Sequence, residues 1–162
     1  MAFSLGIILL LVIPAYCTYV GNEVPLGGPP SVCPELGVFA YAHEQACDQF
    51  YLCQNGTFSS ETCPNGLAFA ADGKVVQFCT YPWHVKCGDK TMPDPIPSDQ
   101  CLWQFGLFPI DDACNSQYFK CAWGIRYVTD CDEGLVYDDT KKACNWPDLL
   151  GCNSEGMNRF SL

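Results

Sequence analysis

The sequence predicts a small disulfide-rich β fold made of two tandem six-cysteine modules, each built of short antiparallel hairpins. Three observations carry this prediction: 13 of the 162 residues are cysteine, twelve of these fall into two sets of six with similar spacing, and turn residues separate short strand-like runs. So many cysteines fit an oxidising compartment and would be unusual in a reduced cytosol.

The amino end predicts a signal peptide over residues 1–17. An uncharged apolar run from Leu5 to Ile13 is ended by Pro14, and the small residues Ala15 and Cys17 suit signal peptidase. The run is too short to span a bilayer and has no flanking basic residues, which disfavours a membrane anchor. Cleavage after Cys17 would leave twelve cysteines, an even number, in a secreted chain that no longer contacts a membrane.

The remaining chain contains one module twice. The intervals between cysteines are 13, 5, 9, 15 and 7 residues in the first copy and 12, 6, 9, 12 and 7 in the second. The copies also agree at glycines and rings, since Gly37-Val38-Phe39 corresponds to Gly106-Leu107-Phe108. The predicted divisions are a flexible lead-in at 18–32, module 1 at 33–87, a proline-rich linker at 88–100, module 2 at 101–152 and a tail at 153–162.

Each module is expected to be stabilised by its own disulfides and separated from the other by a spacer. About 50 to 55 residues are too few for a core that stabilises a fold alone. Closing a loop of about 15 residues with a disulfide contributes roughly 3 kcal/mol in the chain-entropy model. The linker carries Pro93, Pro95 and Pro97, and alternating prolines favour an extended, semi-rigid segment without a hydrophobic core.

Two hairpins are expected in each module. In module 1 the longer one joins Phe50–Cys53 to Thr57–Thr62 through Asn55-Gly56, a pair that suits a type I′ turn. Its counterpart in module 2 joins Tyr118–Cys121 to Ile125–Asp130 and keeps the glycine as Gly124. The shorter hairpins begin at Leu67–Phe69 and Leu135–Tyr137, with turns at 71–73 and 138–140.

The residues disfavour catalysis, metal binding and nucleic-acid binding. His43 and His84 are the only histidines, and neither belongs to a nucleophile–base pattern. The neighbouring carboxylates at 111–112 and 138–139 fit solvated turns better than a glycosidase acid–base pair. No close C-x₂₋₄-C pair marks a zinc site, and a net charge of −10 opposes nucleic acid. We therefore expect no enzyme activity, no cofactor and no metal.

Aromatic rings are the remaining candidates for a binding surface. The chain has 4 Trp, 8 Tyr and 10 Phe, more rings than two modules of this size are expected to bury. Flat rings stack on the apolar face of a pyranose while neighbouring Asn and Asp bind its hydroxyls. Packing on a disulfide is the alternative for each ring, and it is favoured for Phe39, Phe108, Tyr51 and Phe119. The candidate sugar contacts are Phe69, Tyr81, Trp83, Trp123, Tyr137 and Trp146.

One N-glycosylation sequon, Asn55-Gly56-Thr57, lies at the first predicted hairpin turn. A glycan on Asn55 would face solvent. The alternative is that Asn55 is present for the turn alone, and the two interpretations are compatible.

The pattern C-x₁₃-C-x₅-C-x₉-C-x₁₅-C-x₇-C resembles the peritrophin-A type, or type-2, chitin-binding domain. The resemblance includes G-x-F before the second cysteine, F-Y-x-C at the third, G-L-x-F after the fourth and a proline after the fifth. Two copies on a short linker, with C-N-W-P-D at Cys144 to Asp148, further resemble obstructor-type cuticular proteins analogous to peritrophins. The likeness covers residues 33–152.

The resemblance implies a non-catalytic secreted protein that binds chitin in cuticle or peritrophic matrix, with other matrix proteins as further candidate partners. It implies a sugar contact at Asp138, which follows the G-L-x-Y aromatic, whereas Ala70 stands at that position in module 1 and is expected to weaken binding there. Obstructor-type proteins usually have three modules. The implied disulfides are Cys33–Cys53, Cys47–Cys87, Cys63–Cys79, Cys101–Cys121, Cys114–Cys152 and Cys131–Cys144.

Two other functions remain open at this point. A chitin-binding defence protein of the tachycitin type is the main alternative, although the net charge of −10 opposes binding to anionic microbial surfaces. The third candidate function is that of a chitin-modifying enzyme. The sequence leaves no segment for a catalytic domain, which disfavours this function.

Overall fold

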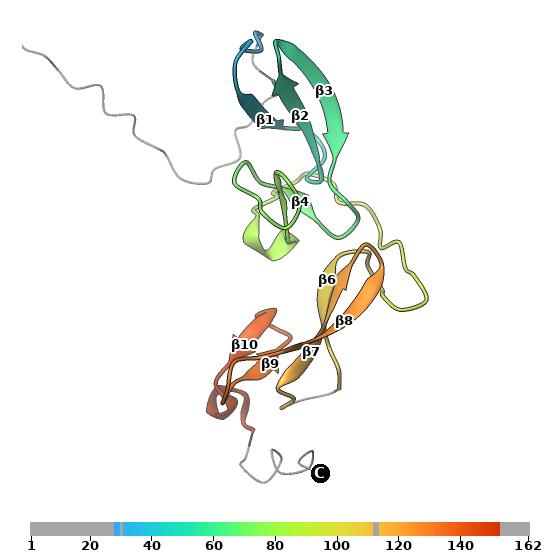
Figure 1. The fold of residues 1–162 in the computed structure, drawn as a ribbon, viewed down its shortest axis with the longest axis vertical. Coiled ribbons are helices and arrows are strands. Elements are labelled where there is room, and N and C mark those ends of the chain that lie inside the picture. Colours follow the sequence, from blue (N-terminus) through green and yellow to red (C-terminus); the bar gives the residue numbers. More distant parts are fainter. Residues whose placement is uncertain (1–27, 30, 112–113, 153–162) are drawn as a thin grey trace, which may run out of the picture.

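The computed structural model describes residues 28–29, 31–111 and 114–152, and it shows two β modules that follow one another along the long axis of the molecule (Figure 1). The predicted signal peptide, most of the lead-in and the tail lie outside the described residues. No helix in the described part of the chain has the length and hydropathy needed to cross a membrane.

Module 1 consists of a three-stranded sheet and a two-stranded one. Strands β1 (Val38–Ala42), β2 (Gln49–Gln54) and β3 (Thr57–Thr62) pair antiparallel in that order, and β4 (Ala68–Phe69) pairs with β5 (Cys79–Thr80). The short 3₁₀ helix η1 (Pro82–His84) follows β5. Asn55 and Gly56 have φ angles of 51° and 74°, which fit the type I′ turn predicted from the Asn-Gly pair.

Module 2 repeats this arrangement. Strands β6 (Gly106–Pro109), β7 (Gln117–Ala122) and β8 (Ile125–Asp130) form its sheet, and β9 (Val136–Asp138) pairs with β10 (Ala143–Asn145) before the 3₁₀ helix η2 (Pro147–Leu150). The turn between β7 and β8 has the same left-handed backbone, with φ angles of 54° at Trp123 and 75° at Gly124. The predicted fold class is confirmed.

Six disulfides lie within the modules, three in each. They join the same pairs that the family resemblance implies, namely Cys33–Cys53, Cys47–Cys87, Cys63–Cys79, Cys101–Cys121, Cys114–Cys152 and Cys131–Cys144. In each module the bond between the fourth and fifth cysteines joins the second short strand, β5 or β10, to the segment that precedes the first, so the shorter hairpin is attached covalently to the chain before it.

A stacked pair of rings fills the centre of each module. Phe50 of β2 stacks on Phe69 of β4 with centroids 5.1 Å apart, and Tyr118 of β7 stacks on Tyr137 of β9 at 4.8 Å. Phe69 therefore takes the core alternative of the two roles considered for it, because its ring is buried against Phe50. Phe39, which was expected in the core, is 41 % exposed because β1 is the edge strand of its sheet.

The linker differs from a free spacer because it is hydrogen-bonded to both modules. Thr91 bridges to Ala46, and its backbone pairs with Cys47 N–H and Gln45 C=O, each at 2.8 Å. Further along, the Ser98 hydroxyl donates to the Gly124 carbonyl of module 2 at 2.6 Å. The alternating prolines keep the segment extended, and the backbone groups of Thr91, Asp94 and Ile96 have hydrogen-bond partners on module 1.

Candidate functional site

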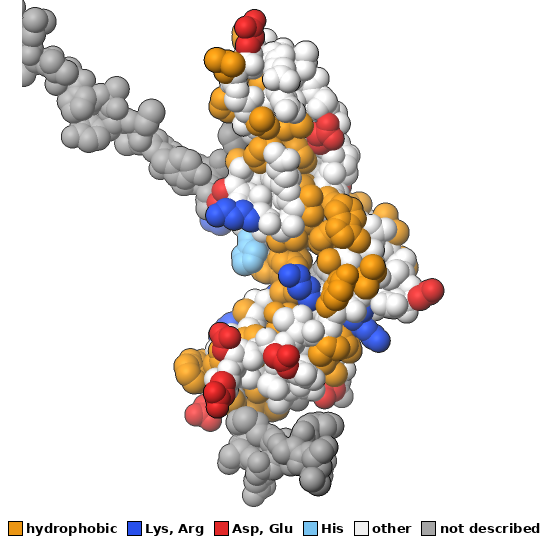
Figure 2. Space-filling model, in the orientation of Figure 1, with side chains coloured by type: hydrophobic (Ala, Val, Ile, Leu, Met, Phe, Trp, Pro, Cys, Tyr) orange, Lys and Arg blue, Asp and Glu red, His pale blue; other side chains and the backbone are white. Residues whose placement is uncertain are grey.

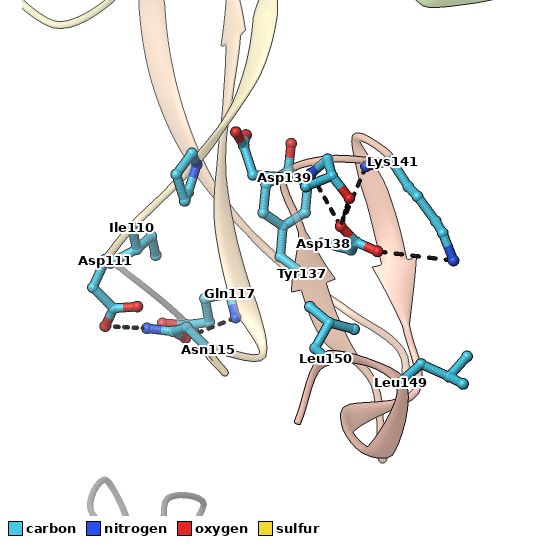
Figure 3. Close-up of a pocket in the computed structure, with 12 residues that line it drawn as sticks. Ile110, Asp111, Asn115, Gln117, Tyr137, Asp138, Asp139, Lys141, Leu149 and Leu150 are labelled. Atoms are coloured by element: carbon cyan, nitrogen blue, oxygen red, sulfur yellow. Dashed lines mark hydrogen bonds and ion pairs between the residues drawn. The ribbon is translucent and has the colours of Figure 1, made fainter. Parts of the chain in front are cut away.

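Module 2 contains a hollow of about 600 Å³. One side is formed by Tyr137 and the turn 138–141, and Asp111, Asn115 and Gln117 face them from the β6–β7 side (Figure 3). Leu149 and Leu150 of η2 also line it. Apolar and polar groups therefore converge on one open space, which is the usual composition of a small-ligand site.

Tyr137 is held in this hollow by its neighbours on both sides. Its backbone N–H donates to the Asn115 carbonyl at 2.8 Å, and its ring stacks on Tyr118. Burial raises the pKa of the Tyr137 hydroxyl, and the nearby carboxylates of Asp139 and Asp138 raise this pKa further. The hydroxyl therefore stays protonated and neutral at any physiological pH.

Asp138 organises the turn that forms the rim of the hollow. Its Oδ1 accepts hydrogen bonds from the Thr140 backbone N–H at 3.0 Å and hydroxyl at 2.6 Å, and its Oδ2 accepts from the Asn145 amide at 3.0 Å. These bonds, with the Thr140 side chain first, hold the pKa of the Asp138 carboxyl below its ordinary value. The buried carboxylate thus fixes the positions of Asp139 and Lys141, which line the hollow beside it.

Acid is expected to weaken this turn. The folded-state pKa of Asp138 lies below its ordinary value of 3.8, so its contribution to stability is complete above that value and is lost as pH falls through the folded-state pKa. Melting temperatures of the full chain between pH 7 and pH 2 should therefore fall less steeply in the acid range for Asp138→Asn than for wild type. The exposed Asp132→Asn serves as control, and a parallel fall in all three proteins would contradict the prediction.

Trp146 is the most exposed of the sequence-predicted ring contacts near the hollow. Its side chain is 63 % exposed, and its backbone N–H donates to the Asn145 side chain, which in turn holds Asp138. Trp146 directly precedes η2, so the residues that line the hollow from η2 follow it in sequence. The Trp146 ring is thus largely exposed to solvent, between β10 and η2.

The other predicted contacts are placed differently. In module 1, Tyr81 is buried and stacks on the half-exposed Trp83 with centroids 4.5 Å apart and planes 5° apart. Trp123 is exposed at the β7–β8 turn, and its edge packs on Phe105 at 4.9 Å. The structure therefore places Tyr137 and Asp138 in the lining of the hollow, and leaves Trp146 and the remaining candidates outside that lining.

The corresponding place in module 1 is filled by its own chain. The loop between the fourth and fifth cysteines is three residues longer there (15 against 12), and Val75, Val76 and Phe78 from this loop pack on the core. Ala70 stands where module 2 has Asp138, and Thr80 where it has Asn145, so the carboxylate network is absent. Only a small cavity lies next to Phe69, with a volume of about 10 Å³.

Asp138 differs from the acid of a glycosidase. A glycosidase acid needs a carboxyl whose pKa is raised, whereas the pKa of Asp138 is lowered and its oxygens are already engaged. His43 Nδ1 accepts the backbone N–H groups of Gln45 and Ala46 and so caps a loop. Among the described residues there is no group of three or more potential metal ligands.

Among the residues that line the hollow, Asn115, Leu149 and Leu150 were not predicted from the sequence as site residues. Asn115 is the extra residue in the longer interval between the second and third cysteines of module 2 (6 against 5), so a signal was present. Its amide donates to Asp111 at 2.9 Å and its carbonyl oxygen accepts from Gln117 N–H at 2.9 Å. Leu149 and Leu150 carried no comparable signal, because apolar residues near a last cysteine fit a core equally well.

Both modules match one family, described as the Chitin binding Peritrophin-A domain, over residues 33–87 and 100–152. The chain belongs to the peritrophin-A family. Among curated proteins it is 33 % identical to "Protein obstructor-E" of Drosophila melanogaster over 155 residues, covering 94 % of this chain and 61 % of that protein. It is 29 % identical to "Peritrophin-1" of Anopheles gambiae, covering 76 % of this chain and 85 % of the relative.

The same peritrophin-A domain also occurs in larger proteins with a different description. The chain is 29 % identical to "Probable chitinase 10" of Drosophila melanogaster over 123 residues, which are 72 % of this chain but only 5 % of that protein. Family membership therefore identifies the module but does not by itself identify the role of the whole protein.

Proposed function

We propose that this protein is a secreted, non-catalytic, chitin-binding structural component of cuticle or peritrophic matrix. The observation that carries the proposal is the hollow of module 2, in a chain whose two modules both belong to the Chitin binding Peritrophin-A domain family. The similarity to obstructor-E and peritrophin-1 supports a matrix protein, and the twelve cysteines paired in six disulfides support an extracellular location.

The chemistry of the hollow suits an uncharged polysaccharide. Leu149 and Leu150 offer apolar surface to the C–H face of a pyranose, and the buried ring of Tyr137 lies behind them in the lining of the hollow. Asp111, Asn115 and Asp139 lie within reach as partners for hydroxyl and acetamido groups. In chitin these two kinds of group recur along every N-acetylglucosamine unit, so one hollow of this size would hold a short stretch of the polymer.

Retention of the mature chain on chitin beads, but not on cellulose, is the expected result. Trp146→Ala is expected to weaken chitin binding roughly three- to tenfold, because a stacked ring contributes about 0.5–1.5 kcal/mol. The control is Tyr127→Ala, which removes another half-exposed ring from β8, away from the hollow. Equal effects of the two substitutions would show that the exposed Trp146 ring beside η2 is not part of the binding surface.

The non-catalytic part of the proposal has its own measurement. Purified wild-type protein incubated with colloidal chitin should release no soluble sugar above the level given by heat-denatured protein. Sustained release that scales with protein concentration would contradict it and would favour the description carried by the chitinase relative.

A further inference from the structure

The core of module 1 contains a side chain from module 2. Phe105 is 4 % exposed and belongs to the same buried cluster as Phe50, Leu67, Phe69 and Tyr81. The matching residue of module 1 is Leu36, since both directly precede the G-x-F motif, and Leu36 is 87 % exposed. The repeat therefore has no intrinsic need to bury this position, and Phe105 is buried only because module 1 lies next to it.

The backbones of the two modules are in direct contact around Phe105. Its N–H donates to the Asn65 carbonyl at 3.0 Å. Gly66, which follows Asn65, lies so close to the backbone of Phe105 that a Cβ atom built on Gly66 would lie 2.1 Å from the Phe105 carbonyl oxygen. Such an approach requires a residue without a side chain, and the glycine of the repeated G-L-x-F motif provides it at this position.

The linker is fastened at the same place by the buried side chain of Asn65. Its amide donates to the Asp94 carbonyl at 2.8 Å, and its carbonyl oxygen accepts the Ile96 N–H at 2.8 Å. Ile96 lies between two prolines, which have no backbone N–H. The bond to Asn65 therefore uses the one backbone donor of these three residues. One residue therefore fixes the linker, while its own carbonyl binds module 2.

Module 2 covers the contact from outside. Trp123 packs on Phe105 in a T-shaped ring pair, and Leu107 and Ala122 pack against the buried cluster that contains Phe105. Figure 2 shows hydrophobic side chains gathered at the middle of the molecule, where the two modules meet. We call the contact made by Asn65, Gly66, Phe105 and Trp123 the joint.

Tyrosines of the two modules also lie close to one another. The hydroxyls of Tyr81 in module 1 and Tyr137 in module 2 are both buried without a protein hydrogen-bond partner. Burial raises the pKa of Tyr81, and the proximity of Tyr118 in module 2 raises it further. Tyr81 thus faces module 2, which explains why it is buried when its counterpart Trp146 is exposed.

We propose that the two modules are one rigid body, in which module 2 completes the core of module 1 through Phe105, and that this pair is the unit that binds chitin. A fixed pair needs no ordering of a flexible linker when both modules contact the polymer, which preserves the gain in affinity from two attachment points. The binding part rests on the proposed function, whereas the rigid joint does not.

The joint is tested by ¹⁵N relaxation of the full mature chain. In wild type the two modules should have the same rotational correlation time. Phe105→Ala should either separate the two values or abolish the dispersed signals of module 1 while those of module 2 persist. Leu102→Ala, an exposed leucine of the same segment, is the control and should match wild type. Different correlation times in wild type, or wild-type behaviour of Phe105→Ala, would overturn the proposal.

A milder variant and a binding measurement complete the test. Trp123→Ala removes only the outer cover of Phe105 and should leave both modules folded while the correlation times begin to diverge. Affinity for chitin beads should fall at least about tenfold in Phe105→Ala and less in Trp123→Ala, relative to Leu102→Ala. Unchanged affinity with a broken joint would refute the pair as the binding unit. Absence of wild-type binding would refute the proposed function and leave the relaxation result standing.

Discussion

Removal of the Cys47–Cys87 disulfide is expected to lower the free energy of unfolding by about 4 kcal/mol, the largest loss from any single bond of module 1. The bond closes a loop with a sequence separation of 40 residues, against 20 for Cys33–Cys53 and 16 for Cys63–Cys79. Longer loops lose more chain entropy on closure, and the shortest should contribute about 3 kcal/mol. Because small domains have total stabilities of only about 5–15 kcal/mol, module 1 should be close to unfolding without this bond.

Guanidinium unfolding of Cys47→Ser/Cys87→Ser and Cys63→Ser/Cys79→Ser measures this order directly. Cys131→Ser/Cys144→Ser in module 2, with a separation of 13 residues, is the matched control for the short loop and should resemble the second variant. Wild type under the same non-reducing conditions provides the reference. A larger loss from the short loop than from the long one would show that loop closure does not set the contribution of these bonds.

Gly66→Ala is expected to destabilise the protein much more than Gly134→Ala, although the two glycines hold equivalent positions in the repeat. Both have left-handed backbones, with φ angles of 97° and 83°, so alanine costs about 1–2 kcal/mol at either site. Only Gly66 lies against another backbone, whereas a Cβ on Gly134 would meet nothing within 4 Å. The clash with Phe105 should add about 1–3 kcal/mol, as is typical of overpacking.

Thermal and denaturant unfolding of the two variants provide the comparison, since each substitution adds the same single methyl group. Gly66→Ala should in addition alter the chemical shifts of Phe105 and its neighbours in module 2, because the clash moves the two backbones apart. If Gly66→Ala and Gly134→Ala lower the stability equally, and Gly66→Ala leaves the chemical shifts of module 2 unchanged, then the joint accommodates the added methyl group without a loss of stability.

The hairpins of both modules follow from local sequence, and this is why they were predictable. Asn55-Gly56 and Trp123-Gly124 adopt left-handed turn conformations that depend on adjacent residues and not on the rest of the protein. The joint was not predictable in this way. Leu36 and Phe105 occupy the same position in the repeat, but Leu36 is exposed and Phe105 is buried. The difference arises because only Phe105 has a module before it in the chain.

The candidate site was predictable in part for a related reason. The order of cysteines and the Asp138 position indicated which hairpin carries the site, and the structure places Asp138 and Tyr137 at the hollow. Sequence did not distinguish buried from exposed rings. Tyr81 and Trp146 match in the repeat, yet Tyr81 lies toward the other module and Trp146 toward solvent.

The arrangement of covalent bonds also determines how the protein would respond to a pulling force. All twelve cysteines of the described chain are paired within a module, so no disulfide crosses the joint. A load applied between two anchored modules is therefore carried by the non-covalent contacts of the joint and by the hydrogen bonds that hold the linker to the modules. The joint should yield first and release the linker, up to roughly 40 Å of chain at 3.3–3.6 Å per residue. The disulfides would then stop further extension and keep the hollow intact while the fibre stretches.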